Sequence, residues 1–191
     1  MSVKSLVIVC SYHHGNTARI ARAMADALGA EVKTQGDVRP EELLEYDLVG
    51  FGSGIDSSRH YKPLLDLADA LPQAEGSRAF IISTCGIPAS MFGKGYIENY
   101  AEESHAALRK KLTSKGYMVA GEFNCAGFNT NGFLKYFGGL NKGRPDAGDL
   151  EDAAAFARNL KARAGKDGIG SRSSGKPEAI ESTLVEADSW R

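Results

Sequence analysis

An excess of charge of one sign and long apolar runs are both missing from this 191-residue sequence. Its 23 basic and 24 acidic residues give a formal net charge of −1, which argues against nucleic acid as a partner and leaves little net field to steer a charged protein. No apolar run approaches the roughly 20 residues that cross a bilayer, and residues 1–4 lead directly into an apolar run rather than a signal sequence. We therefore expect a cytoplasmic protein that binds neither nucleic acid nor membrane.

Cysteine is also scarce, and its spacing excludes the common metal sites. Cys10, Cys85 and Cys125 form neither a Cys-x-x-Cys pair nor a zinc or cluster pattern, so we interpret them as reduced, buried thiols. His13 and His14 do not change this view, because adjacent residues on a turn rarely aim at one ion and no third ligand is nearby. The sequence therefore predicts no metal.

Other binding and nucleophile motifs are absent as well. The glycines at 50–54 lack the sixth-position glycine of a dinucleotide site, and 93–95 lacks the spacing of a P-loop. No glycine-flanked nucleophile turn is present, so no catalytic triad is expected. We interpret His60 and His105 as ordinary polar residues on or near helices, and we assign no catalytic residue.

Apolar runs alternate with helical patterns over the first 164 residues. Continuous apolar runs predict buried strands, and apolar residues at i, i+3 and i+4 predict helices. Strands are predicted at 6–10, 30–34, 48–51, 79–82 and 117–123, and helices at 16–28, 41–45, 64–71, 97–112 and 149–160. Asn16 or Thr17 is the expected cap of the first helix. The alternation predicts an α/β fold built on a doubly wound, five-stranded parallel sheet.

A polar loop separates the first predicted strand from the first helix, and it reads Ser11-Tyr12-His13-His14-Gly15-Asn16-Thr17. Backbone N–H groups at a helix start lack intrahelical partners and carry partial positive charge, so they bind an anion without Lys or Arg. Neither residue type occurs in the loop. Ser11, Asn16 and Thr17 can add donors, while Gly15 allows close approach. The loop predicts a phosphate cradle, with a simple helix cap as the alternative.

This loop resembles the phosphate-binding loop of the flavodoxins, Ser/Thr-x-Ser/Thr-Gly-Asn-Thr. Gly15-Asn16-Thr17 is the matching core, with one added residue and with His13 at the middle hydroxyl position. The resemblance covers residues 1 to about 164 and implies the strand order 2-1-3-4-5. It also implies FMN as the cofactor, bound beyond the carboxyl ends of the strands where the winding reverses, as in flavodoxin itself. FMN carries one phosphate, which suits a single anion cradle.

Two further loops follow strands at the same sheet edge. Residues 52–61 are rich in glycine and serine and would place backbone against a planar ring, unless they are only a helix start rich in caps. Ile55 would cover the ring where many flavodoxins carry an aromatic residue. Residues 83–88 match the family segment that contacts the isoalloxazine ring, with backbone donors at 84–86. The predicted FMN site comprises Ser11, Tyr12, His13, His14, Gly15, Asn16, Thr17, Ser53, Gly54, Ile55, Asp56, Thr84, Cys85 and Gly86.

Two segments have little regular pattern. Residues 126–148 carry Phe128, Phe133, Tyr136 and Phe137, and their 138–145 stretch resembles a subgroup of flavodoxin-like proteins with a Gly-Gly-x-Asn-Lys-Gly-Arg-Pro segment. This loop either packs as a satellite core or forms a lid or docking face for a redox partner. Residues 165–191 predict a flexible tail beyond a 1–164 domain; its last part could be disordered or could dock on a neighbouring copy in a homo-oligomer.

These observations favour a flavodoxin-like, FMN-binding redox protein that carries electrons between partner proteins. An NAD(P)H-dependent FMN quinone reductase acting on a small-molecule electron acceptor is one alternative. A flavin-free interaction module with the same fold is the other.

Overall fold

The computed structural model describes residues 3–74, 76–88 and 94–166. Strands and helices alternate as the sequence predicts, and three short 3-10 helices lie between them. The order is β1 (Ser5–Cys10), α1 (Asn16–Leu28), β2 (Glu31–Thr34), η1 (Gln35–Asp37), η2 (Pro40–Glu45), β3 (Leu48–Asp56), β4 (Arg59–His60), α2 (Lys62–Ala70), β5 (Arg78–Cys85), α3 (Lys94–Ser114), β6 (Met118–Ala126), η3 (Gly132–Phe137) and α4 (Ala147–Lys166).

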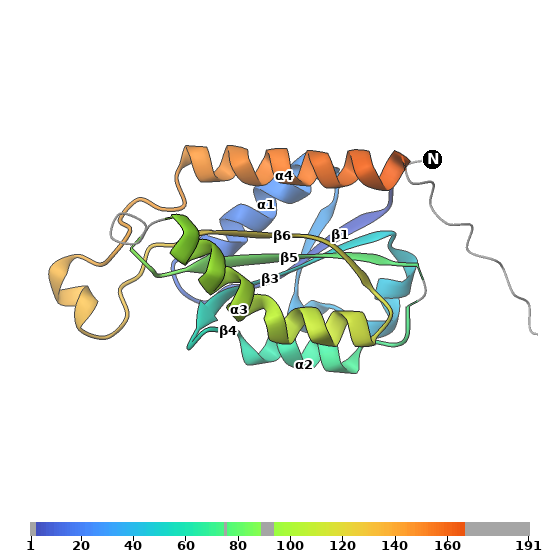
Figure 1. The fold of residues 1–191 in the computed structure, drawn as a ribbon, viewed down its shortest axis with the longest axis horizontal. Helices are drawn as coiled ribbons and strands as arrows, with labels where there is room; N and C mark the ends of the chain where they lie inside the picture. The colour runs from blue at the N-terminus through green and yellow to red at the C-terminus, as the bar shows by residue number, and fades with distance from the viewer. Residues whose placement is uncertain (1–2, 75, 89–93, 167–191) are drawn as a thin grey trace, which may run out of the picture.

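The sheet confirms the predicted topology. Five parallel strands lie in the order β2-β1-β3-β5-β6, which is 2-1-3-4-5 when the parallel strands alone are numbered. The short β4 is a sixth strand that the sequence analysis did not predict, and it pairs antiparallel with β3. Helices α1 and α4 cover one face of the sheet, and α2 and α3 cover the other (Figure 1).

Each face of the sheet has its own hydrophobic core, which explains the continuous apolar runs of the strands. Leu6, Ile8 and Phe51 belong to the core under α2 and α3. Val7 and Phe80 belong to the core under α1 and α4. Because neighbouring residues of one strand point to opposite faces, both must be apolar when helices cover both sides.

The prediction that residues 52–61 form a loop or a helix start is wrong. Strand β3 continues to Asp56, and only Ser57 and Ser58, with φ of 50° and 58°, turn the chain into β4. The glycines of β3 serve close packing instead of turning, because a Cβ at Gly50 would lie 2.4 Å from the Phe80 ring. Glycine composition alone does not separate these two uses.

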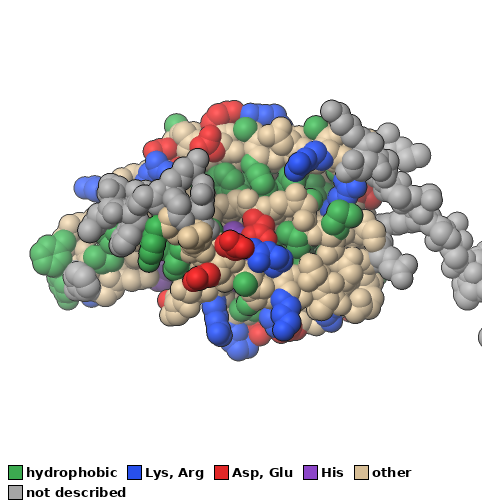
Figure 2. All heavy atoms as spheres, in the orientation of Figure 1, with side chains coloured by type: hydrophobic (Ala, Val, Ile, Leu, Met, Phe, Trp, Pro, Cys, Tyr) green, Lys and Arg blue, Asp and Glu red, His purple; other side chains and the backbone are tan. Residues whose placement is uncertain are grey.

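The segment after β6 projects beyond the body of the molecule and contains η3 (Figure 1). Its base is closed by a bridge between Asn129 and Leu140. Tyr136 and Phe137 at the tip are 77% and 82% exposed, so they do not build the satellite core that was one expectation for this loop. Figure 2 shows hydrophobic side chains gathered at this end, and interspersed acidic and basic side chains elsewhere on the visible face.

Helix α4 runs to Lys166, slightly past the domain limit expected at residue 164. The expected tail therefore falls almost wholly on residues outside the described part of the chain. Within the described ranges, no helix is long and apolar enough to cross a membrane, and no cluster of His, Cys, Asp and Glu is arranged to hold a metal ion.

Candidate functional site

The first functional element is the turn from β1 into α1. His14 and Gly15 both adopt positive φ, 54° and 66°, and reverse the chain so that α1 starts at Asn16. Gly15 is the N-cap and no side chain caps the helix, so the expectation that Asn16 or Thr17 caps it is wrong. The Ser11 hydroxyl is buried without a partner among the described residues. An uncapped helix start beside an unpaired hydroxyl is suited to bind an anion.

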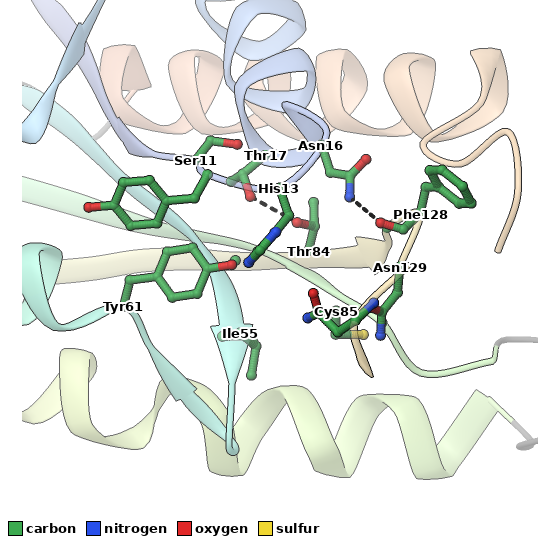
Figure 3. A pocket seen from close by; sticks show the side chains of 15 residues that line it. Ser11, His13, Asn16, Thr17, Ile55, Tyr61, Thr84, Cys85, Phe128 and Asn129 are labelled. Atoms are coloured by element: carbon green, nitrogen blue, oxygen red, sulfur yellow. Dashed lines mark hydrogen bonds between the residues drawn. The ribbon is translucent and has the colours of Figure 1, made fainter. Parts of the chain in front are cut away.

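The side chains of Asn16 and Thr17 do not cap the helix, because they bind residues far along the chain. The Asn16 Nδ2 donates to the Phe128 carbonyl at 2.8 Å, and the Thr17 and Thr84 hydroxyls lie 2.8 Å apart (Figure 3). Both side chains are buried, with Thr17 only 1% exposed. These contacts join α1 to the ends of β5 and β6, where three predicted loops were expected to meet.

The two adjacent histidines separate. His13 lines the cleft, whereas the His14 Nε2 lies 2.8 Å from the Thr130 hydroxyl and its ring packs on Phe128 at a centroid distance of 4.6 Å. The left-handed backbone at His14 turns its side chain toward the segment after β6. His14 therefore fastens the cradle to that segment and does not line the cleft.

A cleft opens at the carboxyl ends of the parallel strands, beside the first turn of α1 (Figure 3). Ten of the predicted site residues line it: Ser11, Tyr12, His13, Asn16, Thr17, Gly54, Ile55, Thr84, Cys85 and Gly86. Four others, His14, Gly15, Ser53 and Asp56, are not among its lining residues. The structure thus brings the three predicted segments together at one place.

Five lining residues were not predicted: Tyr61, Gly127, Phe128, Asn129 and Asn131. Four of them come from the segment that directly follows β6, so the rule that ligands bind at the carboxyl ends of parallel strands could have pointed to them. Asn129 lies against Gly86, where an added Cβ would be 2.2 Å from the Asn129 Nδ2. The cleft encloses about 50 Å³, room for a few water molecules.

An aromatic pair forms one wall of the cleft. The rings of Tyr12 and Tyr61 are 5.2 Å apart at an angle of 30°, and Tyr12 is 60% exposed. Tyr61 lies across Gly54, since a Cβ there would be 2.5 Å from its hydroxyl. Burial raises the pKa of Tyr61, and Asp56 adds to the rise, so this phenol is neutral at physiological pH. Sequence reasoning expected Ile55 alone to cover a ring here.

A second polar cluster lies under α3, behind the end of the sheet. His60 and His105 are 3% and 1% exposed, and their rings stack at 5.1 Å. Serines at the ends of β3 and β5 reach them: Ser53 Oγ is 2.8 Å from His60 Nδ1, and Ser83 Oγ is 2.7 Å from His105 Nε2. Both histidines lie on or next to helices, as expected, and both are buried partners of serines next to the cleft.

The resemblance of the 11–17 loop to the flavodoxins implies FMN, and the residues at the start of α1 suit its phosphate end. The unpaired Ser11 hydroxyl and the uncapped start of α1 offer donors to one phosphate. Tyr12 and Tyr61 offer aromatic surface at the mouth of the same cleft. Asn129 narrows the cleft beside Gly86, so a ring at that edge requires the Asn129 side chain to withdraw.

A doubly wound sheet with this strand order defines a flavodoxin-like fold. Flavodoxin 2 from Bacillus cereus has this fold, with a TM-score of 0.59 and 17% identity over 84% of this chain and 98% of that one. The rubredoxin oxygen:oxidoreductase from Desulfovibrio gigas contains it too, with a TM-score of 0.60 and 12% identity over 85% of this chain and 36% of that one. At such identities the likeness concerns the fold alone.

No family model matches the sequence. The chain is 40% identical over 160 residues to the uncharacterized protein MJ0298 of Methanocaldococcus jannaschii, which covers 83% of this chain and 98% of that protein. It belongs to the same family as MJ0298, a family of flavodoxin-like fold.

Proposed function

We propose that the protein binds FMN in the cleft between Ser11 and Gly86 and carries electrons between partner proteins. The observation that carries this proposal is the uncapped start of α1 beside the unpaired Ser11 hydroxyl, at the edge of the sheet where the winding reverses. Bound FMN would supply one- and two-electron redox chemistry.

Different residues of the chain would bind the phosphate and the ring of FMN. Backbone N–H groups of the 11–17 loop and the Ser11 hydroxyl would hold the phosphate. The Thr17 hydroxyl would exchange its bond with Thr84 for one with the phosphate. Tyr12, Tyr61 and Ile55 would shield the ring from water, and backbone N–H groups at 84–86 would donate to its edge.

A quinone reductase that uses NAD(P)H is the second candidate. The exposed aromatic residues Tyr136 and Phe137 favour it, because planar acceptors bind well against aromatic surface. They also favour a protein partner that docks on this loop, as a carrier requires. The limit of the proposed FMN-binding unit, expected at residue 164, moves to Lys166, where α4 ends.

Absorbance and fluorescence of the purified protein test FMN binding. We expect bound, noncovalent flavin that runs as FMN after release, or stoichiometric quenching of FMN fluorescence on titration. A colourless protein that does not quench FMN would overturn the proposal and favour a flavin-free interaction module.

Anaerobic reduction then separates carrier from reductase. A carrier passes electrons singly, so stepwise reduction should accumulate the one-electron state, and the protein alone should oxidise NAD(P)H slowly. Direct passage to the two-electron state, together with rapid NAD(P)H oxidation in the presence of a quinone, would replace the carrier with the reductase.

A further inference from the structure

The buried histidine pair lies immediately behind the cleft. Ser53 of β3 is paired in register with Ser83 of β5, and the next pair, Gly54 and Thr84, lines the cleft. The histidine side chains thus bind the residues that precede the cleft floor on both strands. This cluster is unused by the proposed binding of FMN.

His105 sits in a chain of hydrogen bonds that ends on Glu122. Its Nδ1 is 2.8 Å from Glu122 Oε2, and its Nε2 is 2.7 Å from the Ser83 hydroxyl. Arg109 binds both oxygens of the same carboxylate. Burial alone would raise the pKa of Glu122, but hydrogen bonds from Arg109 and His105 lower it to about 2. Glu122 is therefore a carboxylate at neutral pH, and the His105 Nδ1 must donate to it.

On the other side of the His105 ring, the Nε2 atom faces the Ser83 hydroxyl. The Ser83 hydroxyl donates to the Asn124 Oδ1 at 2.9 Å. Since the only proton of the Ser83 hydroxyl is used on Asn124, the contact between Ser83 and His105 needs a proton on Nε2. His105 then donates from both ring nitrogens, as an imidazolium does.

The groups around His105 are compatible with one positive charge on its ring. His60, stacked on His105, has its pKa lowered to about 3 by burial and then by the charge on His105, so His60 is neutral. Glu122 faces both Arg109 and His105. Two cations thus share one carboxylate, and this cluster carries a net charge of +1 behind the cleft floor.

We propose that His105 is a buried imidazolium whose charge stabilises negative charge on the flavin ring and so favours reduced over oxidised FMN. This inference rests on the proposed function. A charge in the protein interior is screened far less than one in water. His105 binds Ser83, and the next residue, Thr84, lines the cleft, so the charge on His105 would act on a flavin bound there. His105 touches no cofactor and is a positioning residue that acts by its field.

The charge itself is tested without flavin. Two-dimensional ¹⁵N NMR of the histidine rings in the apoprotein at pH 7.5 should show both ring nitrogens of His105 protonated and His60 neutral. In Asn124→Leu the Ser83 proton has no amide acceptor and can turn to the His105 Nε2, so that ring should become neutral. A wild-type His105 with one protonated nitrogen overturns the inference.

The effect on flavin is tested by measuring Kd for oxidised and for reduced FMN. We expect His105→Gln to lower the preference for reduced FMN about tenfold, the effect of one unit charge at roughly 10 Å in a protein interior. This equals about 30 mV in the two-electron midpoint potential. His60→Gln is the matched control, because it replaces a neutral ring, and it should change the preference less than about twofold.

The outcomes separate the two proposals. Unchanged preference in a His105→Gln protein that binds oxidised FMN like wild type overturns the role of His105 and leaves the proposed function intact. Failure of the wild type to bind FMN overturns the proposed function, whatever the NMR spectrum shows.

Discussion

The two faces of the sheet end differ in how the serine hydroxyls at the ends of the strands are bound. On the α1 face, the Ser11 hydroxyl has no partner among the described residues, and the helix start has no side-chain cap. On the α3 face, Ser53 and Ser83 each bind a histidine and at least one more group. A buried polar group without a partner is costly, so the unpaired Ser11 hydroxyl suits the α1 face to a ligand. On the α3 face the chain itself satisfies both strand serines, although His60 Nε2 and Ser104 Oγ have no partner among the described residues.

The largest expected effect lies on the α3 face and concerns stability in acid. The pKa of His60 is about 3 in the folded protein and about 6.5 in an unfolded chain. The unfolded state therefore binds the proton first, and stability should fall as the pH drops from 6.5 toward 3, by up to about 1.4 kcal/mol per pH unit. Urea unfolding across this range checks it. His60→Gln should flatten the slope, and an equal slope in both proteins contradicts the assignment.

On the ligand face, Thr17→Ala should weaken FMN binding about 10- to 150-fold, because a hydrogen bond to a charged group is worth roughly 1.5–3 kcal/mol. Riboflavin, which lacks the phosphate, should bind almost as before. Thr84→Val is the matched control: it removes the partner of the Thr17 hydroxyl and should leave FMN affinity equal or higher. Equal losses for FMN and riboflavin in Thr17→Ala would show that the phosphate lies elsewhere.

A smaller effect is expected at Asn129, which narrows the cleft beside Gly86. If binding requires this side chain to withdraw, Asn129→Ala should tighten FMN binding a few-fold, because the open state no longer has to be populated first. Isothermal titration of both proteins measures the difference. Weaker binding by Asn129→Ala would mean that this side chain contacts the flavin directly.

The smallest effect is expected at the tip of the projecting loop. The double substitution Tyr136→Ser and Phe137→Ser changes exposed side chains, so it should alter stability by less than about 0.5 kcal/mol and leave FMN affinity unchanged. Thermal unfolding and FMN titration provide the check. A large loss of either would place these aromatic residues in the cleft or the core and remove them as a docking surface.

Sequence reasoning succeeded where the signal is local. The apolar runs located the five parallel strands, and the rule for parallel sheets placed three segments at one edge. It failed where partners are distant in sequence: Asn16 leaves its expected capping role for a carbonyl 112 residues away. His105 likewise depends on Ser83 and Glu122, which only the packing of α3 on β5 and β6 brings together. The spacing of residues in the sequence does not predict hydrogen bonds between side chains that lie far apart along the chain.

The salt bridge between Arg109 and Glu122 has a further consequence for association. Among the described strands, β6 pairs only with β5, and an outer strand of nine residues could template the addition of another chain. Two features discourage this: the register skips Ala120, which is the mark of a bulge, and Glu122 brings a charge onto the strand. We therefore expect that a second copy does not extend the sheet through β6 and that a homo-oligomer would form through another surface.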